Sequence, residues 1–237
     1  MGKTAALGVL LSLALMGHGE LPGQEKNFTV LLKRNFTTKT KLFLHPNSPI
    51  PEERAQSIEL VDFAGTGLEV KYQLSSLNLA LSLSVEYLRV SESRPIQVVS
   101  LHTEIPTEDG YDAIPIELTG YFIIPASSQT VKIFIGGGAG IYLGKRHYSF
   151  ANVEAPVTES QPGFGIHVLG GVSYYFTNWF SVTGEMKFRD LQFRSTNAFT
   201  QARIPYQNSF INVGLTPFES QVQTDGIVFQ LGLGVSF

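Results

Sequence analysis

His147 and Ser149 are the residues whose types and spacing could support nucleophilic catalysis. Two residues apart on a β-strand, their side chains would project from one face, and Glu154 follows shortly after them. A serine nucleophile needs a base and an orienting acid in contact with it, and spacing alone does not place them. No second catalytic motif accompanies the pair. We therefore expect that the chain is not an enzyme.

Metal and cofactor chemistry finds little support in the sequence. The chain has five histidines, none in paired i, i+4 spacing, and no cysteine. The glycine-rich run Gly136–Gly140 lies within a β-prone segment and opens no helix, so it does not match a phosphate-binding loop. We expect no metal and no cofactor. The slightly acidic balance, without a basic cluster, also argues against nucleic-acid binding.

A larger set of charged residues alternates with apolar residues along β-prone segments. In Gly67–Leu74 every second residue is apolar, and Glu69 and Lys71 fall between them. Because strand side chains alternate between two faces, such a segment has one apolar and one polar face. The charged residues that share the polar faces are Glu69, Lys71, Glu86, Glu117, Lys132, Arg146, Glu185, Lys187 and Arg189.

Eight segments carry this alternation. The run from Leu77 to Tyr87 alternates without a break and has the length of a strand that crosses a bilayer, about 9–11 residues. The first segment is less regular, and Lys33-Arg34 predicts a bulge or bend there. The predicted strands are Asn27–Leu44, Gly67–Leu74, Leu77–Tyr87, Tyr111–Ile124, Thr130–Arg146, Gly163–Phe176, Trp179–Arg189 and Gly226–Phe237.

The connections alternate in length. Short turns, such as Ser75-Ser76, follow the second, fourth and sixth strands, and long loops separate the others; three of these are Ser91–Gly110, His147–Pro162 and Ser195–Asp225. If neighbouring strands are antiparallel, all short turns lie at one end, as in bacterial outer-membrane barrels. We predict an all-β fold, an eight-stranded antiparallel up-and-down transmembrane β-barrel. Its composition, 43% hydrophobic and 16% charged, fits a membrane protein of this class.

The N-terminus predicts export. Lys3 precedes the apolar run Ala5–Met16, and the small residues of Gly17-His18-Gly19 then suit signal-peptidase cleavage. A buried N-terminal helix is the weaker alternative, because nothing amphipathic follows to pack on it. We assign residues 1–19 to a signal peptide and residues 20–237 to the barrel domain.

Three stretches carry a family resemblance. They are the C-terminal strand ending in Phe237, the glycine-rich stretch Lys132–Gly144, and Gly163–Arg189. The chain resembles the small eight-stranded outer-membrane β-barrels, the OmpA/OmpX/OmpW-like group. The resemblance implies that the last strand carries the signal for the barrel-assembly machinery, at Phe229, Leu231, Leu233, Val235 and Phe237.

A barrel of eight strands is just wide enough for its side chains to fill it. The inward charges of both signs therefore favour an ion-paired polar plug over a gated solute path. We expect an integral protein of the cell outer membrane, a monomer in contact with outer-membrane lipid, with a structural or surface-interaction role. The first alternative is a passive channel for small or hydrophobic solutes, as in OmpW-like barrels. The second is an enzyme resembling lipid A deacylases, some of which carry a His-x-Ser pair with a separate glutamate.

Overall fold

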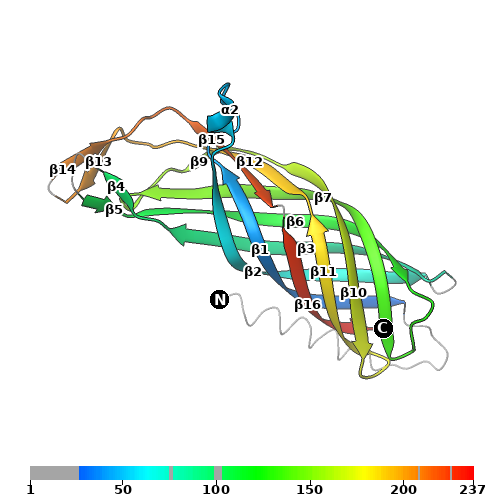
Figure 1. Cartoon of the computed structure of the whole chain (residues 1–237). Coiled ribbons are helices and arrows are strands. Elements are labelled where there is room, and N and C mark those ends of the chain that lie inside the picture. The colour runs from blue at the N-terminus through cyan, green and yellow to red at the C-terminus, as the bar shows by residue number, and fades with distance from the viewer. Residues whose placement is uncertain (1–26, 75–76, 99–102, 208, 225) are drawn as a thin grey trace.

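The computed structural model describes residues 27–74, 77–98, 103–207, 209–224 and 226–237. Its main body is a closed antiparallel barrel of eight strands, which confirms the predicted fold class (Figure 1). The predicted signal peptide and the turn at Ser75-Ser76 lie outside the described residues. In order around the barrel, the strands are β1 (Phe28–Phe43), β2 (Ser57–Leu74), β3 (Leu79–Ser93), β6 (Thr107–Ile123), β7 (Val131–Phe150), β10 (Gly163–Tyr175), β11 (Phe180–Arg189) and β16 (Ile227–Ser236).

The first and last strands close the barrel. β1 pairs with β16 from Thr29↔Ser236 to Thr37↔Val228, and Phe28 and Phe237 exchange backbone hydrogen bonds of 3.2 and 2.9 Å. The predicted bulge or bend at Lys33-Arg34 is wrong, because β1 keeps one register with β2 and one with β16 through these residues. The charged pair preserves the alternation: Lys33 is buried in the lumen and Arg34 is exposed on the outer wall.

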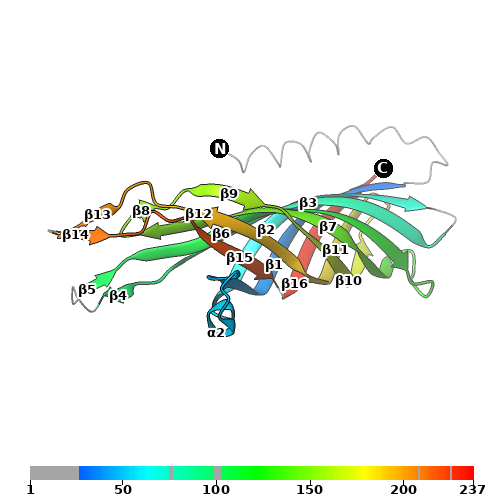
Figure 2. The same cartoon turned by 90° about the horizontal axis from the view of Figure 1, so that it is seen from above.

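The two ends of the barrel differ. The connections from β2 to β3, β6 to β7 and β10 to β11 are short and meet at the end that also holds Phe28 and Phe237. We call this the short-turn end; it lies at the lower right of Figure 1. The other connections are long and extend from the opposite, long-loop end, as Figure 2 also shows. This is the loop asymmetry that the sequence predicts.

The long-loop end contains more regular structure than the predicted loops. β3, β6 and β7 continue well beyond their predicted ends, because backbone pairing persists where the apolar alternation stops. The additional elements are α2 (Pro51–Arg54), β4 (Ile96–Val98), β5 (Thr103–Ile105), β8 (Val153–Glu154), β9 (Val157–Gln161), β12 (Leu191–Asn197), β13 (Arg203–Tyr206), β14 (Ser209–Asn212) and β15 (Phe218–Thr224). β4 pairs with β5, and β13 with β14, as two hairpins at the tip.

Beyond the end of β11, towards the long loops, the strand pairing of the barrel wall changes. β12 follows β11 after Asp190 but pairs with β9 and β15, and β15 in turn joins the end of β1. The start of β10 then lies very close to β12: a Cβ atom at Gly163 would clash with the carbonyl oxygen of Gln192. Only glycine permits this approach of the two backbones.

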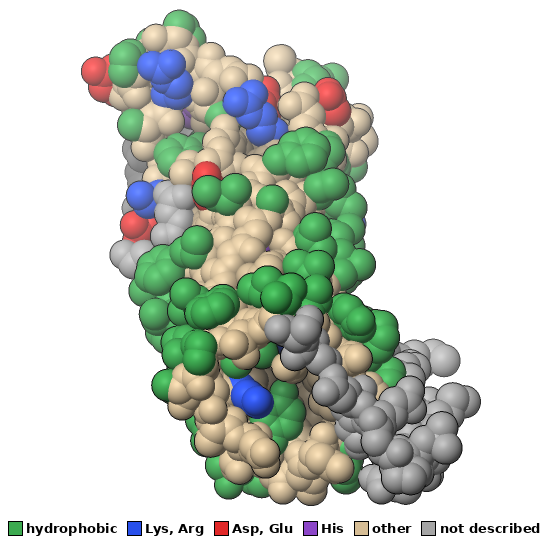
Figure 3. Space-filling model, turned by 90° about the vertical axis from the view of Figure 1, so that its right-hand side faces the viewer, with side chains coloured by type: hydrophobic (Ala, Val, Ile, Leu, Met, Phe, Trp, Pro, Cys, Tyr) green, Lys and Arg blue, Asp and Glu red, His purple; other side chains and the backbone are tan. Residues whose placement is uncertain are grey.

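The outer wall of the barrel is apolar. Leu118 is 60% exposed and Leu231 is 58% exposed, and similar side chains cover the neighbouring strands. Figure 3 shows hydrophobic side chains over the lower part of the molecule and charged side chains gathered near the top, at the long-loop end. Within the described residues, no helix has the length and apolar character to span a membrane. An exposed apolar surface of this extent fits contact with hydrocarbon.

Candidate functional site

The inward faces of five strands, β1, β2, β3, β6 and β11, bring ionised residues together inside the barrel. β11 supplies three of them at alternate positions, which strand geometry directs to the same side. These residues form two clusters, one around Lys33 and one around Lys187 and Arg189. We call the set the charged layer: Lys33, Glu69, Lys71, Glu86, Glu117, Glu185, Lys187 and Arg189.

The first cluster is centred on Lys33 of β1. Its ammonium group lies between the carboxylates of Glu69 and Glu185, at 2.5 Å from the latter. Lys71 contacts the other side of Glu69 at 3.4 Å, and the Tyr121 hydroxyl donates a hydrogen bond of 2.9 Å to that carboxylate. Each ion in the cluster therefore has an opposite charge within contact distance.

The second cluster joins β11 to β3 and β6. Lys187 Nζ lies 2.6 Å from Glu117 and 3.2 Å from Glu86. Arg189 Nη1 contacts the same two carboxylates at 3.4 and 2.7 Å. Gln230 of β16 donates to Glu86 at 2.8 Å and to Asn35 at 2.9 Å, which links the last strand to the cluster and to β1.

The charged layer is electrically balanced, with four acids and four bases. All but Lys71 have nearly no solvent contact. An isolated buried charge costs several kcal/mol, and pairing offsets that cost. The carboxylates do not satisfy every hydrogen-bond donor of the layer: the Nε and Nη2 atoms of Arg189 lack a hydrogen-bond partner among the described residues. Loss of any carboxylate would leave four cations to share three carboxylates.

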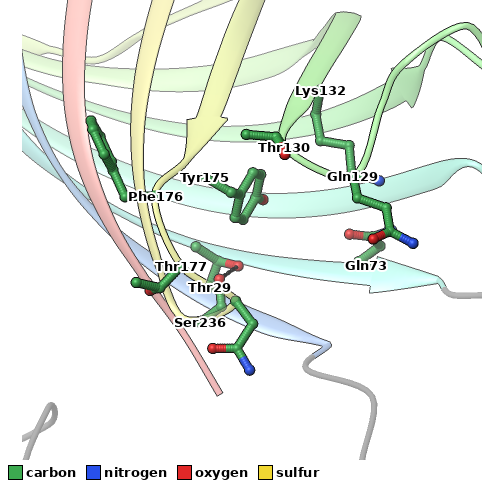
Figure 4. A pocket seen from close by; sticks show the side chains of 10 residues that line it. Thr29, Gln73, Gln129, Thr130, Lys132, Tyr175, Phe176, Thr177 and Ser236 are labelled. Atoms are coloured by element: carbon green, nitrogen blue, oxygen red, sulfur yellow. Dashed lines mark hydrogen bonds between the residues drawn. The ribbon is translucent and has the colours of Figure 1, made fainter.

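Two residues of the predicted lumen network lie elsewhere. Lys132 is at the short-turn mouth, in a recess of about 390 Å³ with Thr29, Tyr175 and Ser236 (Figure 4). Arg146 is at the long-loop end, where its Nε and Nη2 donate hydrogen bonds of 2.8 and 2.6 Å to Asp109. The structure brings the other seven predicted residues together in the charged layer.

Sequence reasoning missed several inward polar residues. Lys33 is absent from the predicted set because a bulge or bend was expected at this point of the first strand. The available signal was its place in the alternation with apolar neighbours. His167, absent from the predicted set, is buried in the lumen, and its Nε2 lies 2.9 Å from the hydroxyl of Thr119. Asp109, the partner of Arg146, falls in a region predicted to be a loop.

Apolar side chains fill the lumen between the charged layer and the long loops. Phe193 of β12 packs against Tyr111 with ring centroids 5.8 Å apart. Tyr111 also shares a hydrogen bond of 2.9 Å with Thr40. We call this set the apolar layer: Leu42, Leu60, Leu88, Val90, Tyr111, Ala113, Tyr142, Leu191, Phe193 and Val222. Both layers consist of buried side chains that pack inside the barrel.

The His147–Ser149 pair does lie on one face, but on the outer wall. His147 Nε2 is 2.5 Å from Asp112 Oδ2. Ser149 is paired in register with Glu154 of β8, and no hydrogen bond joins it to His147 among the described residues. The described geometry thus gives the serine no activating base. Among the described residues, no group of His, Asp and Glu side chains is arranged to hold a metal ion.

The predicted assembly residues lie on the outward face of β16. Phe229, Leu231, Leu233 and Phe237 are exposed on the wall, and Val235 shares their face. Their strand is held between β1 and β11, so its apolar stripe is free only on the outside. In the folded barrel this stripe contributes to the apolar wall.

Comparison with known proteins supports the fold. No protein-family model and no curated protein sequence matches the chain. The solved structure of the outer membrane protein OprG from Pseudomonas aeruginosa superposes with a TM-score of 0.57 at 10% identity, over 92% of this chain and 99% of OprG. Neisserial surface protein A gives a TM-score of 0.48 at 13% identity, over 89% of this chain and 97% of that one. Ail of Yersinia pestis gives 0.46 at 11%, over 90% and 100%.

The chain therefore has the fold of the small eight-stranded outer-membrane barrels. At this level of identity the likeness to OprG concerns the fold alone. The closed barrel and its apolar wall are consistent with the bacterial outer membrane.

Proposed function

We propose that this protein is an integral outer-membrane barrel with a sealed lumen and a structural or surface-interaction role. The observation that carries the proposal is the charged layer, in which seven of eight ions are almost fully buried and all are paired. A conducting path would hydrate these groups. Direct pairing across the lumen, with the apolar layer above it, instead fits a packed plug.

The long-loop end supports the surface role. Residues from the three connections β3–β6, β7–β10 and β11–β16 form a separate apolar cluster there, around Ile105, Ala151 and Ile204. Tyr206 donates a hydrogen bond of 2.9 Å to the backbone of Glu104, which ties the β13–β14 hairpin to β5. Loops held together in this way present a fixed surface, as recognition of a partner favours. In the proposed orientation, this end faces the outside of the cell.

A liposome-swelling assay tests the sealed lumen. Refolded protein is inserted into liposomes, and their swelling in a small neutral sugar is compared with that of protein-free liposomes. We expect equal rates. Swelling that depends on the protein would contradict the proposal, provided that a heat-dependent gel shift shows the inserted barrel to be folded.

A second candidate is lateral passage of small hydrophobic solutes. It is favoured by a recess of about 340 Å³ on the wall where β11 ends, lined by apolar residues such as Ile166 and Phe188 and reaching Arg189. Filling the recess with Val168→Trp would slow entry of a hydrophobic dye into cells that produce the protein. Val182→Trp, on the same wall but outside the recess, is the control. Equal dye entry with and without the protein would dismiss this candidate.

The deacylase alternative has the weakest support, because no base is hydrogen-bonded to the Ser149 hydroxyl among the described residues. A Ser149→Ala variant is expected to leave the acylation of lipid A in cells unchanged. Acylation that differs between cells with the wild-type protein and cells with this variant would reverse that assignment.

A further inference from the structure

A group of basic side chains surrounds one carboxylate on the outer wall. Asp112 of β6 is paired directly with Arg89 of β3 on one side and with Lys145 of β7 on the other. His147 lies two residues further along β7, on the same face. These three strands are adjacent in the barrel, so the four side chains form one patch.

Asp112 holds the patch together. Its Oδ2 lies 2.5 Å from His147 Nε2 and 4.0 Å from Lys145 Nζ, and its Oδ1 lies 3.8 Å from Arg89 Nε. The Tyr87 hydroxyl donates a further hydrogen bond of 3.2 Å to Oδ1. The carboxylate is largely buried by these neighbours, whereas the side chains of Arg89 and Lys145 are 63% and 55% exposed. The basic groups are thus gathered but remain open to the outside.

The patch has more positive charge than its single acid can neutralise. Among the described residues, Asp112 is the only carboxylate paired with any of the three basic side chains. Arg89 contacts Asp112 through Nε, and most of its side chain is exposed. The nearest acid along β6 on this face, Glu108, is hydrogen-bonded to Ser91. A guanidinium fork with a neighbouring ammonium group suits the oxygens of a phosphate.

The patch borders the apolar wall. Ile114 of β6 and Leu143 of β7 are exposed apolar residues that are directly paired. Each lies two residues nearer to the short-turn end than Asp112 and Lys145, respectively. Tyr87 is exposed beside them on β3. A molecule with phosphate at the patch and hydrocarbon on these residues would match both chemistries at once. Free phosphate would use only the first.

We propose that Arg89, Lys145 and His147 form a binding site for the phosphate group of a membrane lipid, whose acyl chains lie along the wall formed by Tyr87, Ile114 and Leu143. Asp112 acts as a positioning residue that holds the basic groups together. The site lies outside the lumen and does not depend on whether the lumen is sealed. It rests only on the membrane placement of the barrel.

The test uses refolded full-length protein in neutral detergent, with native mass spectrometry to count bound lipid. The probes are a phosphorylated lipid A and phosphatidic acid, and inorganic phosphate is added as a competitor. The double variant Arg89→Gln/Lys145→Gln is expected to weaken lipid binding by about 25-fold, because each cation near a lipid surface contributes a factor of about five. The matched control is Arg94→Gln/Arg203→Gln, which removes one partly exposed and one exposed cation from the long-loop end.

Equal losses in the two double variants would overturn the proposal, since binding would then follow net charge alone. Unchanged binding in the patch variant would also overturn it. Displacement of the lipid by inorganic phosphate at equal concentration would identify an anion site without lipid specificity, and would likewise reject it. If the double variant does not fold, Lys145→Gln alone is used, and a loss of binding of severalfold is expected. A lipid that lacks phosphate should not bind to the patch in any variant.

Discussion

The charged layer and the apolar layer fill the same barrel by opposite means. In the charged layer, each side chain is held by a specific partner, such as Lys187 between Glu86 and Glu117. In the apolar layer, Leu42, Phe193 and their neighbours are held by shape and by exclusion from water. The difference lies in what a single substitution leaves behind: an uncompensated charge in the first case and a cavity in the second.

The comparison also explains their order along the lumen. The apolar layer separates the charged layer from the long loops, while the short-turn mouth opens into a polar recess near Lys132. The apolar layer excludes water from one side of the charged layer. This strengthens the ion pairs, because electrostatic attraction grows as the surroundings become less polar. The two layers therefore support each other as one plug.

The largest effect is expected for Glu117→Gln. This change leaves Lys187 and Arg189 to share Glu86, and we expect a loss of about 3–5 kcal/mol in the free energy of unfolding. Urea unfolding of the refolded protein in detergent measures it. Glu159→Gln makes the same chemical change at an exposed residue of β9 and should cost nearly nothing. A similar stability for both variants would show that the charged layer does not act as a paired unit.

A smaller but clear effect is expected in the apolar layer. Phe193→Ala should lower the free energy of unfolding by about 3 kcal/mol through lost packing and a new cavity. Phe210→Ala, at an exposed position on β14, is the control and should be close to neutral. The same urea titration applies. An effect of Phe193→Ala below about 1 kcal/mol would mean that the upper lumen is loosely packed.

The smallest effect is expected for an ion pair outside both layers. Arg194→Gln removes an exposed contact of 3.4 Å to Glu219 and should cost less than about 1 kcal/mol. Repeating the titration in 1 M salt should abolish this difference and leave most of the Glu117→Gln effect, because salt screens exposed charges far more than buried ones. If salt reduced both effects equally, the charged layer would have to be accessible to water.

Much of the fold followed from the sequence, because alternation and loop lengths directly reflect lipid outside and polar residues inside. Leu77–Tyr87 and Gly163–Phe176 could be assigned in this way. The long-loop structure could not, since strands such as β12 and β15 face water or the apolar layer and carry no lipid-facing stripe.

The sequence predicted most of the charged residues of the candidate site but not which of them pair with each other. Alternation placed Glu69, Glu117 and Lys187 on inward faces, and the structure agrees. Alternation does not give the depth of a residue along the lumen, so Lys132 and Arg146 were grouped with residues at a different depth. Depth depends on strand tilt and register, which are set by pairing between strands rather than within one.

Single-channel recording in planar bilayers tests the sealed lumen most directly. The refolded wild-type protein, with its fold verified by heat-dependent gel mobility, is added to a bilayer in concentrated potassium chloride. The paired charged layer and the apolar layer above it predict a baseline without discrete current steps. Reproducible steps of uniform size that depend on the folded protein would contradict the plug and would establish a conducting lumen.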